Sequence, residues 1–201
     1  QLAAVLGEEG ADIRTGHQVT AVHHRDDGLV LTCKSAQGET EIVCDKVLVA
    51  VGRRARTEGM GLEALGIVRD GRIEVDEKLQ TVVPTVYACG DAIGGYQLTH
   101  AASHEAWHAT VNALFGAFKT FSADYSKLPW CTFTDPQVAH VGHNEDSARA
   151  ESIDYEVTRY DLAELDRAIA ESATHGMVKV LTVPGKDTIL GATIVGDAAG
   201  E

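Results

Sequence analysis

Residues 85–91 read Thr-Val-Tyr-Ala-Cys-Gly-Asp, and a glycine-rich turn follows at Gly94-Gly95. The apolar run before Gly90 is typical of a buried strand. Asp91 would then stand at the carboxyl edge of that strand, which is where open α/β sheets bind ligands. A glycine at position 90 would let a ligand approach the backbone, and the carboxylate could accept hydrogen bonds from sugar or polyol hydroxyls. Spacing alone leaves an alternative equally open, in which Asp91 merely caps the next helix.

Helix and strand patterns extend on both sides of this motif. Leu98–Phe118 is rich in alanine and predicts a long helix, whose first N–H groups would face a ligand above Asp91. Upstream, Gly28–Ser35 and Glu39–Asp45 predict a hairpin, and Lys46–Val51 predicts a strand buried on both faces. Downstream, the sequence predicts a helix at 144–151 and strands at 129–133, 138–141, 155–160, 177–183 and 188–195. This order predicts an α/β and α+β fold.

The composition excludes several classes of protein. Lys and Arg number 17 against 30 Asp and Glu, which gives a formal net charge of −13. A nucleic-acid partner needs a basic face, and so does a polybasic membrane contact, so neither is expected. With 44% hydrophobic and 23% charged residues, the chain has the composition of a folded soluble protein.

The cysteines and the two ends of the sequence carry weaker signals. No two cysteines have CxxC or zinc-site spacing, so free thiols in a reducing compartment and a cytoplasmic location are expected. No secretory leader and no apolar run of about 20 residues is visible. A helix that should begin at Asp197 stops after about one turn, so we expect a piece of a longer protein. The cysteines are Cys33, Cys44, Cys89 and Cys131.

Three ordered segments resemble the class I pyridine nucleotide–disulfide oxidoreductases, the family of dihydrolipoamide dehydrogenase, glutathione reductase and mercuric reductase. Thr85–Asp91 resembles the family's second flavin motif, and residues 129–142 resemble the opening of its interface domain. Residues 49–63 resemble its A-x-G-R-x-P-N-T-x-x-L-G-L-E segment, except that Ala55 replaces Pro and Arg56 replaces Asn. The resemblance covers essentially the whole chain.

The resemblance implies the C-terminal portion of such a flavoprotein, with partial FAD/NAD(P)-binding Rossmann-like domains followed by an α+β interface (dimerisation) domain. Residues 1–66 would belong to the NAD(P)-binding domain, residues 67–126 to the FAD-binding domain, and residues 127–201 to a truncated interface domain that forms a homodimer. The family's G-x-G-x-x-G motifs, close cysteine pair and C-terminal acid/base histidine do not occur in the sequence. We therefore expect no catalytic residue in this chain and no turnover by it alone.

The resemblance also assigns residues to two cofactors, FAD and NAD(P)H, between which the family passes hydride on its way to a disulfide or metal-ion acceptor. Asp91, next to Gly90, would hydrogen-bond the ribityl chain of FAD. Gly52 would lie against the nicotinamide nucleotide, and Arg53 would grip a phosphate or carboxylate or remain solvated. The start of the long helix would line the flavin's N1 and C2-carbonyl side. The residues there are Gln97, Leu98, Thr99 and His100.

Two further hypotheses remain open. His100, His104 and His108 recur every fourth residue and share one helix face. Such a stripe can ligate a metal, although a flavin-facing or solvated helix explains it without one. The second hypothesis is a non-catalytic oligomerisation or interaction module that self-associates through residues 127–201, and flavin binding would discriminate it from a cofactor site.

Overall fold

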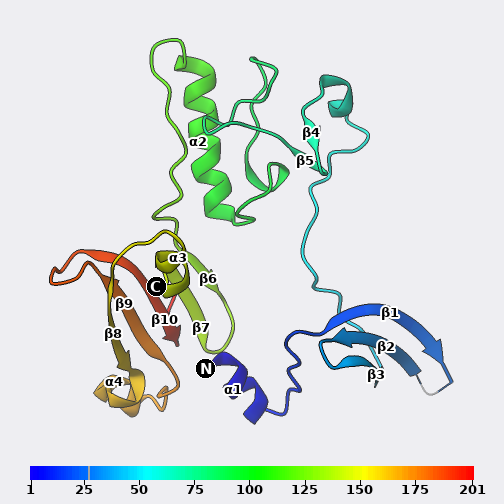
Figure 1. The fold of residues 1–201 in the computed structure, drawn as a ribbon, viewed down its shortest axis with the longest axis vertical. Helices are drawn as coiled ribbons and strands as arrows, with labels where there is room; N and C mark the ends of the chain where they lie inside the picture. The colour runs from blue at the N-terminus through cyan, green and yellow to red at the C-terminus, as the bar shows by residue number, and fades with distance from the viewer. Residues whose placement is uncertain (27) are drawn as a thin grey trace. The chain divides into compact units, whose positions relative to one another are not determined.

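The computed structural model describes residues 1–26 and 28–201, and the chain forms two compact units, Gln1–Gly52 and Arg53–Glu201. The first unit holds one helix and a three-stranded antiparallel sheet in the order β1-β2-β3 (Figure 1). Val30 and Cys33 of the middle strand are buried. The elements are α1 (Leu2–Glu8), β1 (Gln18–Arg25), β2 (Gly28–Ser35) and β3 (Gly38–Cys44).

The first part of the second unit is a long helix with irregular segments running alongside it (Figure 1). Ile67 and Leu79 of these segments are almost fully buried, as is Ala101 of the helix. The elements are η1 (Leu62–Leu65), β4 (Val68–Arg69), β5 (Arg72–Ile73), η2 (Gly90–Ala92) and α2 (Thr99–Phe115). The predicted helix over residues 98–118 is therefore confirmed, within three residues at its C-terminal end.

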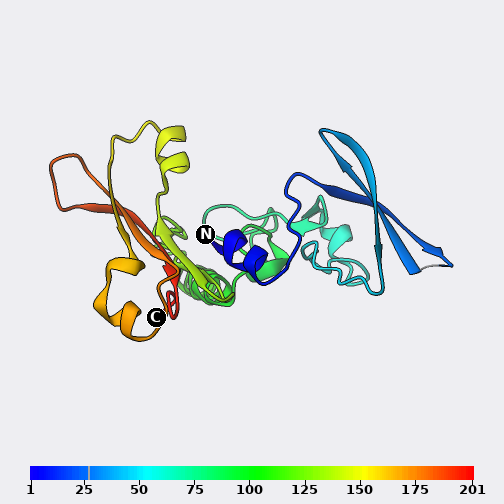
Figure 2. The same ribbon diagram turned by 90° about the horizontal axis from the view of Figure 1, so that it is seen from below.

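The last part of the second unit is a five-stranded antiparallel sheet in the order β6-β7-β10-β9-β8. Leu181 in β9 and Val195 in β10 are buried hydrophobic residues of this sheet. Figure 2 shows α3 and α4 at opposite ends of β8. The elements are β6 (Trp130–Thr132), β7 (Gln137–Gly142), α3 (Glu145–Ala150), β8 (Glu156–Asp161), η3 (Leu162–Glu164), α4 (Asp166–Ala170), β9 (Met177–Thr182) and β10 (Ile189–Gly196).

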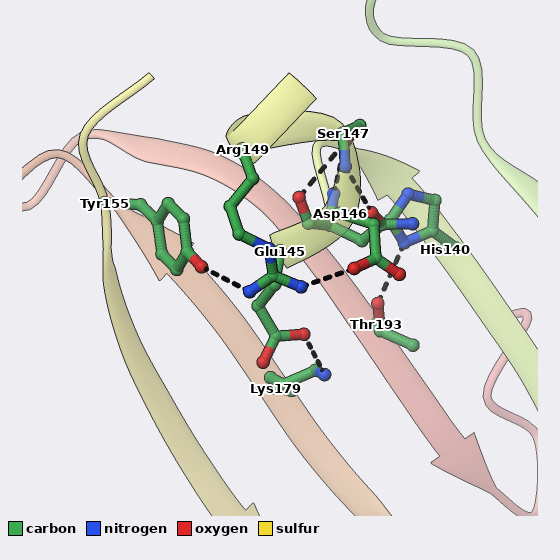
Figure 3. A network of polar contacts seen from close by, with 9 residues as sticks. His140, Glu145, Asp146, Ser147, Arg149, Tyr155, Lys179 and Thr193 are labelled. Carbon is green, nitrogen blue, oxygen red and sulfur yellow. Dashed lines mark hydrogen bonds and ion pairs between the residues drawn. The ribbon is translucent and has the colours of Figure 1, made fainter. Parts of the chain in front are cut away.

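Polar side chains fix α3 to this sheet (Figure 3). Asn144, the first residue of the helix predicted at 144–151, caps α3 and forms a capping box with Ser147. Glu145 in the first turn accepts a hydrogen bond from Lys179 of β9 at 2.5 Å. Arg149 in the last turn pairs with Asp146 and donates to the Tyr155 hydroxyl at 3.1 Å.

Two predicted strands and one predicted helix are wrong. Lys46–Val51 is irregular and exposed, with 92% of Leu48 accessible. Thr81–Cys89 forms a turn with a single bridge between Gln80 and Tyr87. Within the described residues neither segment has a neighbouring strand to pair with, and a buried strand requires such neighbours on its edges. Residues 197–200 form a turn where the sequence predicts a helix start.

Candidate functional site

A cavity of about 670 Å³ opens beside the turn that carries Asp91. This volume lies in the range of small-molecule sites. Its wall combines carboxylate, hydroxyl and amide groups with the methyl groups of two alanines, which suits a ligand with a polar part and a flat apolar part. The lining residues are Arg53, Cys89, Gly90, Asp91, Gln97, Thr99, Ala102, Ser103 and Ala106.

Gly90 brings the turn close against α2. Its φ of +72° is a left-handed conformation, and a Cβ at this position would lie 3.3 Å from the Cβ of Ala102. The turn leaves Asp91 partly exposed, with 44% of its side chain accessible. Its Oδ2 lies 3.4 Å from Nε of Arg53, whose side chain is itself 77% exposed. Such an exposed ion pair contributes little free energy, so Asp91 remains available to a ligand.

The start of α2 borders two cavities. Gln97 and Thr99 line the cavity of Asp91, and the Gln97 amide donates to the Arg53 carbonyl at 3.5 Å. Gln97 and Thr99, together with Leu98 and His100, also line a second cavity of about 860 Å³ bordered by β6, β7 and β10. His100 Nε2 hydrogen-bonds the Pro129 carbonyl. No side chain caps the first turn of α2.

The structure therefore gathers five of the eight predicted residues around one cavity. Gly90, Asp91, Gln97, Thr99 and Arg53 line it, whereas Leu98 and His100 line only the second cavity. Gly52 is the last residue of the first unit. Its contact with a nicotinamide nucleotide stays a prediction.

A buried acid that is not among the residues predicted from the sequence lies behind the turn. Glu105 of α2 is 1% exposed and accepts hydrogen bonds from Gly90 N–H at 2.6 Å and from the Tyr125 hydroxyl at 3.1 Å. Burial, and secondly the Glu105 charge, raises the pKa of the Cys89 thiol and raises the pKa of Tyr125 to about 12. The sequence signal was an acid four residues from both Ala101 and Ala109, on the apolar stripe of the helix.

The histidine stripe does not form a metal site. Across residues 1–26 and 28–201, no group of three or more His, Cys, Asp or Glu side chains could hold a metal ion. The rings of His104 and His108 instead contact each other in a tilted arrangement, with their centroids 4.4 Å apart and an angle of 57° between their planes. All four cysteines are free thiols, as predicted. No helix in the described part of the chain is both long and apolar enough for a membrane span.

Two models of one protein family match successive segments of the chain. The pyridine nucleotide-disulphide oxidoreductase model matches residues 1–106, and the dimerisation-domain model of the same family matches residues 128–201. Mitochondrial dihydrolipoyl dehydrogenases of Cricetulus griseus and Homo sapiens are each 37% identical over 202 residues. These alignments cover 98% of this chain but only 39% of either relative.

Solved structures agree with the sequence matches. LpdA from Mycobacterium tuberculosis superposes with a TM-score of 0.83 at 25% identity, covering 100% of this chain and 44% of that one. The HOCl-induced flavoprotein disulfide reductase RclA from Escherichia coli gives a TM-score of 0.81 at 25% identity, covering 98% and 45%. These matches confirm the predicted fold class and the resemblance on which it was based. The chain belongs to the pyridine nucleotide-disulphide oxidoreductase family.

Proposed function

We propose that this chain supplies cofactor-binding and dimerisation parts of an FAD-dependent NAD(P)H oxidoreductase. The whole protein would pass hydride from the reduced nicotinamide through the flavin to a disulfide or metal-ion acceptor. The observation that carries the proposal is the accessible Asp91 carboxylate on a glycine turn beside a cavity of about 670 Å³. The chain spans 39% of its curated relatives' length, so the activity is proposed for the whole protein.

The residues around the cavity fit the middle of a flavin nucleotide. Asp91 can accept hydrogen bonds from the ribityl hydroxyls, and the Thr99 and Ser103 hydroxyls can donate or accept. Ala102 and Ala106 leave a smooth surface on which a flat ring could lie. The uncapped first turn of α2 would stabilise negative charge on the ring by about 0.3–1 kcal/mol. When bound, FAD supplies the hydride chemistry, and the protein binds and orients it.

Several finer assignments belong to the same proposal. Residues 1–66 would complete an NAD(P)-binding domain, in which Gly52 lies against the nicotinamide nucleotide, and residues 67–126 an FAD-binding domain. Residues 127–201 would make a homodimer, which the match to the family's dimerisation domain supports. Four free thiols support a reducing compartment, and we propose the cytoplasm.

FAD titration of the purified chain tests the cofactor site. Flavin fluorescence should report binding that weakens at least about tenfold in Asp91→Asn, because a hydrogen bond to a charged group contributes about 1.5–3 kcal/mol. Asp187→Asn, which removes an exposed charge from the β9–β10 turn, is the matched control and should bind as the parent does. Equal affinity of the two variants would contradict the site.

A second measurement separates the proposed function from the interaction-module alternative. We expect the isolated chain to dimerise in analytical ultracentrifugation and to show no NAD(P)H oxidation with added FAD. A colourless dimer that binds no added FAD would favour the module. Robust turnover by the chain alone would contradict the expectation that catalytic parts lie elsewhere.

A further inference from the structure

We propose that Glu105 is the positioning residue of the Asp91 turn and that it couples this turn to the segment leading into the dimerisation domain. The functional part of this inference rests on the proposed role of Asp91. Its structural part is the link from Gly90 through one carboxylate to Tyr125, and that link can be tested without any cofactor.

Both oxygens of the carboxylate are engaged, each by a different segment. Oε2 accepts the backbone N–H of Gly90, the residue before Asp91, at 2.6 Å. Oε1 accepts the hydroxyl of Tyr125 at 3.1 Å. Tyr125 lies two residues before the part of the chain predicted as the dimerisation domain. One side chain of α2 therefore joins the cofactor-binding turn to the connection with the five-stranded sheet.

Burial of Glu105 makes both of its hydrogen bonds costly to lose. Glu105 is 1% exposed, and a carboxylate buried without hydrogen-bond donors is costly, so losing either donor is unfavourable. Tyr125 is also held from the side, with ring centroids 5.4 Å from Tyr96 and 6.0 Å from His104. A displacement of Tyr125 would therefore be transmitted through the carboxylate to the backbone that carries Asp91.

Three substitutions of Glu105 separate its charge from its placement. Glu105→Ala removes the acceptor, and amide exchange at Gly90, followed by NMR, should accelerate at least about tenfold. Glu105→Gln keeps an acceptor of the same length and should retain most of the protection. Glu105→Asp keeps the charge but shortens the side chain by one methylene, so exchange should resemble that of the alanine variant. Amides of β9 and β10 should exchange at the parent rate in all three.

Tyrosine titration and FAD binding complete the test. In Glu105→Gln the pKa of Tyr125, followed by tyrosinate absorbance against Tyr125→Phe, should fall from about 12 because the neighbouring charge is lost while burial remains. FAD affinity should fall in the alanine variant and return in the glutamine variant. Unchanged Gly90 exchange in Glu105→Ala, or equal acceleration throughout the unit, would overturn the inference. If no variant and no parent binds FAD, the proposed function fails, whereas the exchange result still decides the link.

Discussion

Asn112, near the C-terminal end of α2, offers a strong test of how this unit is held together. Its side chain is 2% exposed and makes three hydrogen bonds to backbone groups. Nδ2 donates to the carbonyls of Lys78 at 3.0 Å and Phe121 at 2.7 Å, and Oδ1 accepts from Phe121 N–H at 2.8 Å. Asn112→Ala removes all three, and at about 1 kcal/mol each the loss should be about 3 kcal/mol.

Asn112→Asp sharpens this prediction because it preserves the shape of the side chain. The aspartate can still accept from Phe121 N–H, but it turns an oxygen toward two carbonyl oxygens. It should therefore destabilise at least as much as alanine at neutral pH, and less in acid, where the carboxyl group can donate. Thr110→Ala, an exposed change on the same helix, is the control and should stay within about 0.5 kcal/mol.

Urea unfolding followed by tryptophan fluorescence measures these effects. Trp107 lies on α2 with its ring centroid 5.7 Å from that of Phe121, so it reports directly on the contact that Asn112 makes. A loss of about 3 kcal/mol is a large share of the 5–15 kcal/mol that stabilises a typical domain. Asn112 does not hold this unit together in the way described if Asn112→Ala unfolds at the same urea concentration as Thr110→Ala. The same follows if Asn112→Asp loses less free energy of unfolding than Asn112→Ala at neutral pH.

Two further predictions concern the five-stranded sheet. A Cβ on Gly191 would lie 2.0 Å from the His143 carbonyl oxygen, so Gly191→Ala should lower the free energy of unfolding by about 3 kcal/mol. Gly185→Ala is the control and should lower it by about 1–2 kcal/mol, because only its positive φ is strained. Equal urea midpoints for the two variants would contradict this prediction. Lys179 holds the pKa of Glu145 below its usual 4.5, so their pairing stabilises fully above that pH and is lost as the pH falls through the lowered value. Glu145→Gln should cost about 0.5 kcal/mol at pH 7 and nothing in strong acid, and a pH-independent cost would argue against the pairing.

Local patterns were enough to predict much of this fold. The alanine-rich run predicted α2, and the runs at 177–183 and 188–195 predicted β9 and β10. α2 satisfies its backbone hydrogen bonds within its own segment, and β9 and β10 pair with each other across one short turn. Nearby residues are therefore enough to indicate these elements. The Asn144 cap is of the same kind, since it depends only on the next three residues.

Segments whose conformation depends on distant partners could not be predicted in this way. Lys46–Val51 has the apolar composition of a buried strand, yet composition does not reveal whether an adjacent strand exists to pair with it. The motif at 85–91 was expected to present Asp91 at the end of a buried strand, whereas in the structure a glycine turn carries Asp91 beside the start of α2. The role of Asp91 in cofactor binding stays a prediction. Glu105 was not predicted because its burial depends on the Gly90 turn and Tyr125, which the sequence of the helix alone does not reveal.

The buried stripe of α2 explains how an irregular region can present a defined site. Its buried positions include Glu105, His108 and Asn112 among alanines, so much of its contact with the neighbouring segments is polar. Glu105 fixes the Gly90 turn and Tyr125, and Asn112 fixes Lys78 and Phe121. Hydrogen bonds are directional, whereas alanine packing tolerates sliding, so the position of each loop is set by one buried polar side chain. Substitutions that keep the volume but lose the donor or acceptor should therefore disturb the site more than losing a methyl group would.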